Sequence, residues 1–362
     1  MSNMESKSVL VVGTGTIGEP LIGLLSRLKD TMGLDRVLFH KRTPLDYEVA
    51  KVNSLIEQGA ELVVNEDQVI NFQSLGHKIT STLHRALEMV DVVIDCTPAG
   101  NKNKQSFYET YADNSDKLFV AQGSEKGFGF PYAFGINDNE MMAADSQFVQ
   151  VVSCNTHAIS RIIKTLNPTL DDNFVSGDFV CIRRANDASQ DAGYIPSPTC
   201  SKHTDAEFGT HHARDVSDLL ETITKEPMNI MSSALKVNSQ YMHLVRFSVT
   251  LRENLALEDV TERFQKDKFV TVTQLKSANR VFSFGRDHGF YGRIYNQAVV
   301  YTPSLIVRPR KNHEGSIVSG FVYTPQDGNS LLTSAATCLY GLHGKDYLEK
   351  IAPILTFLRD EV

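Results

Sequence analysis

The sequence lacks the cysteine spacing that marks a structural metal site or a disulfide framework. Its five cysteines contain no CxxC pair, and an odd number cannot be fully paired within one chain. This pattern argues against a zinc-stabilised fold and against a set of structural disulfides. Reduced cysteines are typical of intracellular proteins.

Long apolar runs and an excess of positive charge are also missing. Residues 1–8 are polar and contain no apolar signal core, and no apolar run approaches the roughly 18 residues of a membrane span. The net charge is -7, and the basic residues are scattered. Neither a nucleic acid nor a membrane is therefore expected as a partner. These absences predict a cytoplasmic protein.

The residues that are present predict two domains. The 362 residues suffice for two domains of about 150 residues each. Strands alternate with helices over 1–153, which predicts an α/β, Rossmann-type domain with a doubly wound parallel sheet. Period-two runs dominate 154–324, which predicts an α+β catalytic domain with a mixed or antiparallel sheet and one interior helix at 257–266. Helices within about 325–362 are expected to pack back on the first domain.

A glycine motif follows the first expected strand. Gly13-Thr14-Gly15-Thr16-Ile17-Gly18 has the form GxGxxG and lies between an apolar strand at 8–12 and a helical stripe at 17–28. In this context the glycines allow a tight turn and let a pyrophosphate approach the helix N-terminus. The motif predicts a dinucleotide site; a glycine-rich turn without a ligand is the alternative.

The end of the second expected strand is basic rather than acidic. His40-Lys41-Arg42-Thr43 stands where an NAD-specific site places an acidic residue for the ribose hydroxyl. Two cations and a hydroxyl suit a 2′-phosphate. The turn therefore predicts NADP as cofactor, with NAD possible; an exposed basic turn is the alternative.

Cys154 lies where an apolar, β-branched run ends and a helical stripe begins. The unpaired N–H groups at a helix N-terminus favour a thiolate, which is the nucleophilic form. Position alone fits a nucleophile and a small buried hydrophobe about equally well. Three loops, 97–100, 122–127 and 153–154, follow expected parallel strands, and ligands bind at that edge of such sheets. This common edge favours the nucleophile.

A histidine pair, His211 and His212, follows a long loop. A metal site would need a third ligand or an HExxH spacing, which is absent. Either histidine alone is more often structural. A cysteine nucleophile needs a base, however, so the pair with Cys154 predicts redox acyl chemistry.

Together these motifs resemble those of the archaeal-type phosphorylating glyceraldehyde-3-phosphate dehydrogenases. Ser153-Cys154-Asn155-Thr156 with Arg161 resembles the SCNTTGLCR signature of that family. The resemblance covers nearly the whole chain in the same order. The other matching segments are 13–18 (GYGTIG), 95–104 (DCTPxG…KNK), 122–126 (QGGEK), 183–187 (RRAADP) and 211–216 (HHGPDV).

The resemblance implies a mechanism and a set of site residues. Cys154 would attack the aldehyde carbon of D-glyceraldehyde 3-phosphate, His211 or His212 would act as base, and a hydride would pass to NAD(P). Inorganic phosphate would then release 1,3-bisphosphoglycerate from the thioester, and the enzyme would be a homotetramer without a metal. Substrate contacts would come from Ser153, Asn155, Thr156 and Arg183, and cofactor contacts from Gly13, Gly15, Thr16, Ile17, Gly18, Lys41, Arg42, Thr97, Gly123, Arg184 and Gln326.

The chain also departs from the family pattern at two points. His157-Ala158 replaces Thr-Gly beyond Thr156, and Ala213-Arg214 replaces Gly-Pro beside the expected base. Both changes bear on the phosphate pocket and the phosphorylating step. The alternative is another acyl-cysteine enzyme, such as an NADP-dependent semialdehyde or acyl-phosphate reductase or a CoA-acylating dehydrogenase. A cofactor-binding regulatory protein without catalysis is a third possibility, against which the intact cysteine, histidines and glycine loop argue.

Overall fold

The computed structural model describes residues 6–362 apart from 114, 124, 188–194 and 326. The chain forms two compact units. Unit 1 comprises Met1–Pro131, Met141–Val151 and Leu331–Thr356, and unit 2 comprises Tyr132–Glu140, Val152–Ser330 and Phe357–Val362. Among the helices of the described residues, none has the length and apolar character needed to cross a membrane.

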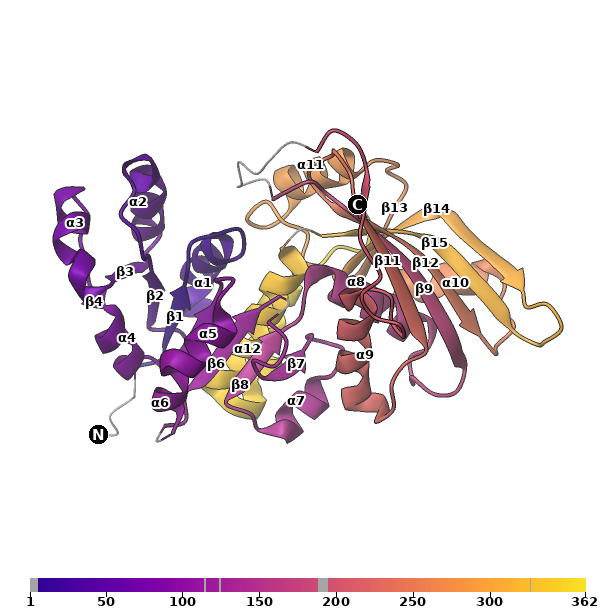
Figure 1. Cartoon of the computed structure of the whole chain (residues 1–362), viewed down its shortest axis with the longest axis horizontal. Helices are drawn as coiled ribbons and strands as arrows, with labels where there is room; N and C mark the ends of the chain where they lie inside the picture. The colour runs from indigo at the N-terminus through magenta and orange to yellow at the C-terminus, as the bar shows by residue number, and fades with distance from the viewer. Residues whose placement is uncertain (1–5, 114, 124, 188–194, 326) are drawn as a thin grey trace. The chain divides into compact units, whose positions relative to one another are not determined.

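Unit 1 contains a sheet with the strand order β4-β3-β2-β1-β5-β6-β8-β7 (Figure 1). All neighbouring strands from β4 to β8 in this order are parallel. This confirms the expected doubly wound α/β sheet. The strands are β1 (Ser8–Val12), β2 (Arg36–His40), β3 (Glu61–Val64), β4 (Ser81–Thr82), β5 (Val92–Asp95), β6 (Leu118–Gln122), β7 (Phe130–Tyr132) and β8 (Phe148–Val151).

Helices connect these strands, as parallel pairing requires. After β1 the chain builds β2, β3 and β4 on one side and then returns to β5 on the other. The gap between β1 and β5 is therefore the topological switch point, where such sheets bind their ligands. The connecting helices are α1 (Gly18–Met32), α2 (Val49–Glu57), α3 (Val69–Ser74), α4 (Leu83–Met89), α5 (Gly100–Asn103), α6 (Glu109–Ala112) and α7 (Asp138–Ala144). Helices α12 (Gly328–His343), α13 (Tyr347–Lys350) and α14 (Ala352–Leu355) come after β15 (Ser316–Thr324) in the chain, and α7 and α12 each begin in unit 2.

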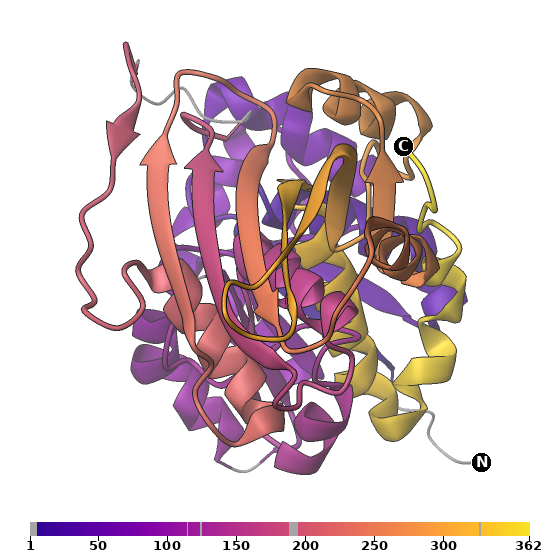
Figure 2. The ribbon, with the colours of Figure 1, turned by 90° about the vertical axis from the view of Figure 1, so that its right-hand side faces the viewer.

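Unit 2 contains a sheet with the order β10-β11-β9-β12-β15-β14-β13, whose strands Figure 2 shows from one face. The pairs β9–β12, β12–β15, β14–β15 and β10–β11 are antiparallel, whereas β9–β11 and β13–β14 are parallel. The sheet is therefore mixed, as the period-two runs predict. Its strands are β9 (Phe174–Arg183), β10 (Thr199–Cys200), β11 (Ile230–Lys236), β12 (His243–Leu251), β13 (Val270–Thr273), β14 (Ala298–Pro309) and β15 (Ser316–Thr324).

The helices of unit 2 are more numerous than the sequence analysis expected. The expected helix at 257–266 is α10 (Leu257–Lys266). The sequence analysis identified only this interior helix and missed two others, α9 (His211–Thr224) and α11 (Ala278–His288). The first turn of α9 is mostly polar, with Ala213 as its one buried apolar residue, and the larger apolar residues begin at Val216, so the helical spacing is weak near the histidine pair.

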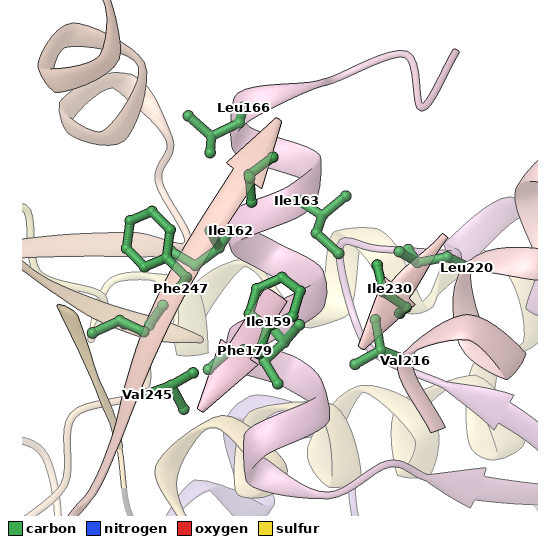
Figure 3. Close-up of a cluster of buried hydrophobic side chains, with 14 of the residues drawn as sticks. Ile159, Ile162, Ile163, Leu166, Phe179, Val216, Leu220, Ile230, Val245 and Phe247 are labelled. Atoms are coloured by element: carbon green, nitrogen blue, oxygen red, sulfur yellow. The ribbon is translucent and has the colours of Figure 1, made fainter. Parts of the chain in front are cut away.

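The core of unit 2 fixes the position of α8 (Cys154–Leu166). Ile159 and Ile162 are fully buried, and Figure 3 shows them between side chains of the sheet and of α9. Interiors of this kind are close-packed, so the helix cannot shift without opening a cavity. The N-terminus of α8, and Cys154 with it, is consequently held in place by apolar packing several residues away. The labelled neighbours in Figure 3 are Ile163, Leu166, Phe179, Val216, Leu220, Ile230, Val245 and Phe247.

Candidate active site

The glycine loop of unit 1 has the geometry of a phosphate cradle. Gly13 has φ +98, and a Cβ on Gly18 would lie 2.1 Å from the carbonyl oxygen of Gly13, so both positions exclude larger residues. A Cβ on Gly15, in contrast, would meet no atom within 4 Å. The loop is therefore closed on the protein side and open where a pyrophosphate would approach the N-terminus of α1.

A cavity of about 520 Å³ lies over this loop, entirely within unit 1. The loop at Thr97 forms one wall, because Asp95 accepts hydrogen bonds from the Thr97 hydroxyl (2.6 Å) and backbone N–H (2.8 Å). The cavity has a size typical of ligand sites and suits the adenosine part of a dinucleotide. Its lining residues are Val12, Gly13, Thr14, Gly15, His40, Lys41, Arg42, Thr43, Leu45, Asn65, Leu83, Cys96, Thr97, Pro98, Ala99, Asn103 and Phe107.

The two cations of the basic turn differ in whether a carboxylate already pairs with them. Lys41 is buried, and its ammonium group is paired with the carboxylate of Glu48. Arg42 is exposed at the cavity and has no ion-pair partner among the described residues. Arg42 is thus free to meet a 2′-phosphate, whereas Lys41 already has a counter-charge.

In unit 2, Cys154 is the first residue of α8 and is partly exposed. Burial of the thiol raises its pKa, and the charge of Arg184 and the N–H of Asn155 act in the opposite direction. The expectation of a thiolate stabilised at the helix N-terminus is therefore wrong for the protein without ligands. Desolvation outweighs the helix terminus and the neighbouring cations.

The residues around Cys154 are held in place by helix capping and by hydrogen bonds. The Ser153 hydroxyl caps α8 by accepting the N–H of Thr156 (3.3 Å), and the two hydroxyls are 2.8 Å apart. Asn155 accepts a hydrogen bond from Thr324 (3.3 Å), and Asn329 donates to the Cys154 carbonyl (3.0 Å). Capping explains Ser153 and Thr156 structurally, and their substrate contacts stay a prediction.

The two neighbouring histidines occupy different environments. His211 is exposed, whereas His212 is only 3% exposed, and their rings lie 4.0 Å apart between centroids. Neither ring nitrogen of His212 has a hydrogen-bond partner among the described residues. Burial, with the charges of His211, Arg183 and His243, lowers the pKa of His212 to about 2. Buried polar atoms without partners are rare in native proteins, and each calls for an explanation such as a catalytic role, a bound water or an ion.

Arg183 links these groups electrostatically. The positive charge of Arg183 acts to lower the pKa of Cys154, against the larger rise caused by burial. The same charge lowers the pKa of His211 and of His212, where burial is the larger cause. Its guanidinium makes no hydrogen bond or ion pair with the described residues. Arg184, in contrast, is committed to the carbonyl of Tyr241 (2.8 Å) and to the carboxylate of Asp187. Arg183 is consequently the cation that is available to an anionic ligand.

The sequence analysis missed a third histidine in this group. His243 begins β12 and pairs in register with Thr324, the residue that contacts Asn155. Its Nδ1 atom is buried without a partner. Burial and the charges of Arg184 and Arg183 lower its pKa to about 3. No local motif marks His243, because only the pairing of β12 with β15 brings it to this end of the sheet.

Two further residues of the cysteine motif are structural. His157 is fully buried, and its Nδ1 lies 2.9 Å from the Ser153 carbonyl, where it supports the first turn of α8. Arg161 is 4% exposed, and its guanidinium contacts Gln297 (2.7 Å), the Gly135 carbonyl (2.8 Å) and Asp267 (3.3 Å). A fully paired Arg161 anchors α8 rather than binding substrate.

The remaining predicted cofactor residues stay predictions. Ile17 is the residue before α1, and Gly123 follows β6 with φ +74 and open space around it. Thr16 lies in the glycine loop, and Gln326 lies outside the described residues. Within the described part of the chain, no group of three or more His, Cys, Asp or Glu residues is arranged to hold a metal ion.

The dinucleotide-type cavity of unit 1 and the cysteine–histidine group of unit 2 define a class, the dinucleotide-dependent oxidoreductases. A glyceraldehyde-3-phosphate dehydrogenase from Pyrococcus abyssi is 29% identical over 297 residues, 80% of this chain and 81% of the relative. The same enzyme from Sulfolobus acidocaldarius is 27% identical over 309 residues (83% and 84%), and that from Methanopyrus kandleri is 29% identical over 298 residues (79% of each). No family model matches the sequence. The relatives confirm the resemblance to the archaeal-type enzymes.

Proposed function

We propose that this protein is a phosphorylating glyceraldehyde-3-phosphate dehydrogenase that uses NAD(P), with NADP preferred. The observation that carries the proposal is the group formed by Cys154, the unpartnered His212 and the unpaired Arg183 in unit 2. The glyceraldehyde-3-phosphate dehydrogenases that match about four fifths of this chain, and of their own length, support the substrate. The open glycine loop of unit 1 fits a dinucleotide, whose nicotinamide would supply the hydride acceptor.

In the proposed reaction, the Cys154 sulfur attacks the aldehyde carbon, and the carbonyl oxygen takes up a proton to complete a thiohemiacetal. His212 removes that hydroxyl proton while a hydride leaves the same carbon for the nicotinamide-type acceptor, which turns the thiohemiacetal into the thioester. Inorganic phosphate then attacks the thioester carbon, the carbon–sulfur bond breaks, and the acyl phosphate leaves. Cys154 returns to its starting form.

The cations around His212 explain why a phosphorylated aldehyde suits this site. In the free protein, burial and the surrounding positive charges keep the imidazole neutral and weakly basic. A dianionic phosphate beside Arg183 would offset those charges and raise the basicity of His212. We therefore expect glyceraldehyde without its phosphate to be oxidised at a much lower kcat/KM.

The direct test is an assay of the purified protein with glyceraldehyde 3-phosphate, NADP or NAD, and phosphate or arsenate. Absorbance of the reduced cofactor should rise, and Cys154→Ser should abolish the signal, whereas Cys200→Ser, at an exposed thiol on β10, serves as the matched control. Turnover of a semialdehyde in place of glyceraldehyde 3-phosphate would favour the other acyl-cysteine reductases. An unchanged rate in Cys154→Ser would refute the mechanism.

The choice between the two histidines has its own test. His212→Asn should lower kcat by a factor of about 100 to 10,000, the usual contribution of a general base. His211→Asn should have a smaller effect, because that ring is exposed. The reverse order would assign the base to His211.

The cofactor preference follows from the basic turn. Lys41→Ala together with Arg42→Ala should weaken NADP binding far more than NAD binding, and equal losses would show that the turn does not hold a 2′-phosphate. The homotetramer and the cytoplasmic location stay predictions; sedimentation of the purified protein tests the former.

A further inference from the structure

A bridging carboxylate lies beside the basic turn of unit 1. One oxygen of Glu48 is paired with the ammonium group of Lys41, and the other accepts a hydrogen bond from Lys51 (2.8 Å). Glu48 closes a short 3₁₀ turn (Asp46–Glu48), and Lys51 is in the first turn of α2. The group is semi-enclosed, with side-chain exposures of 8% for Lys41, 19% for Glu48 and 26% for Lys51.

The bridge continues to the glycine loop. The Lys51 ammonium lies 3.3 Å from the carbonyl oxygen of Thr14 and 3.4 Å from the carboxylate of Glu19. Burial raises the pKa of Glu48, but the hydrogen bonds from Lys41 and Lys51 outweigh it and leave the pKa below its ordinary value. Glu48 is therefore ionised at neutral pH. The positive charges of Lys41 and Lys51 are balanced by the negative charges of Glu48 and Glu19, so the network has no net charge.

This charge balance reduces the positive charge that the basic turn presents to a nucleotide. Lys41 and Arg42 both line the cavity, but only Arg42 lacks a counter-charge among the described residues. A 2′-phosphate that approached Lys41 would compete with Glu48 for the same ammonium group. A ribose 2′-hydroxyl carries no charge and would meet no such competition.

We propose that Glu48 sets the cofactor preference of this protein by holding Lys41 away from the 2′-phosphate, so that NADP is favoured only moderately and NAD also binds. The inference rests on the proposed use of a nicotinamide dinucleotide. It concerns binding alone and does not depend on which aldehyde is oxidised. Glu48 is a specificity-determining residue that acts through Lys41.

The test measures dissociation constants of NADP and NAD for the whole protein by titration calorimetry, without an aldehyde. Glu48→Gln keeps the shape of the side chain and removes the charge. We expect NADP to bind about fivefold more tightly to this variant, as release of one partly buried cation implies, and NAD binding to change less than about twofold. An unchanged or lower ratio of NADP to NAD affinity would overturn the proposal.

A second variant keeps the test decisive if Glu48→Gln does not fold. Lys51→Met leaves Glu48 with Lys41 as its remaining ammonium partner, so the carboxylate should hold Lys41 more strongly. We expect NADP binding to weaken by about threefold or more relative to NAD binding. An equal loss for both nucleotides, or a gain for NADP, would count against the role of Glu48.

A double variant tests whether Glu48 acts through Lys41: Glu48→Gln is introduced into a protein that already carries Lys41→Met. The gain in NADP affinity from Glu48→Gln should disappear when Lys41 is already Met, and a persisting gain would contradict the proposed competition. The proposed function fails separately: absence of binding of either nucleotide refutes both statements. An unchanged affinity ratio in a protein that still oxidises glyceraldehyde 3-phosphate refutes the role of Glu48 alone.

Discussion

The buried histidine in the first turn of α8, His157, should make the stability of unit 2 depend on pH. His157 is fully buried, and burial lowers its pKa from 6.5 to about 4, although the Ser153 carbonyl acts in the opposite direction. In the unfolded chain the imidazole takes up a proton near pH 6.5. The folded form is therefore favoured above pH 6.5, and the contribution of His157 to stability is lost as the pH falls towards 4.

The size of the effect follows from the two pKa values. A difference of about 2.5 in pKa corresponds to about 3 kcal/mol of unfolding free energy. Between pH 7 and pH 5 the folded ring stays mostly neutral while the unfolded ring becomes protonated, so about 2 kcal/mol of this is lost. The lowered pKa values of His212 and His243 also make stability fall with decreasing pH. The contribution of His157 must therefore be isolated by substituting that residue.

We expect His157→Gln to lose about 2 kcal/mol less stability than the wild type between pH 7 and pH 5. Unfolding by guanidinium can be followed by circular dichroism, which needs no tryptophan; the chain has none. His313→Gln, at an exposed histidine, is the control and should follow the wild type. Identical pH dependence of the wild type and His157→Gln would refute the reasoning.

The remaining predictions concern the anchoring of α8, the glycine loop and the thiol. Arg161→Met should lower the free energy of unfolding by about 3 to 5 kcal/mol, because the Asp267 carboxylate loses its ion-pair partner in a largely buried position. A loss below about 1 kcal/mol in denaturant titrations would contradict this. Gly18→Ala should abolish dinucleotide binding in calorimetry, because its Cβ would lie 2.1 Å from the Gly13 carbonyl oxygen. The rate at which iodoacetamide alkylates Cys154 in the free protein should rise with pH through a pKa above the ordinary thiol value, and a plateau already at pH 7 would show a stabilised thiolate.

Much of the fold was predictable because its signals are local. Ser8–Val12 is a fully buried central strand whose residues after Ser8 form an uninterrupted apolar run, and α10 has the expected bounds. The helix that carries the histidine pair was not expected. Its first turn is mostly polar, and the stripe of Val216, Leu219 and Leu220 becomes meaningful only against the core of unit 2.

The sequence by itself predicted the kind of chemistry from two local features, a glycine loop between the first strand and its helix and a cysteine at a much later strand-to-helix junction. Both features are formed by residues adjacent in the chain, and the local backbone geometry of such residues can be predicted from the sequence. Tertiary structure decided which groups are available. It buried His212 and exposed His211, added His243 through the pairing of β12 with β15, and neutralised Lys41 with Glu48. It also reversed the expected effect on the Cys154 pKa, because desolvation and charge depend on the whole surrounding fold and not on adjacent residues.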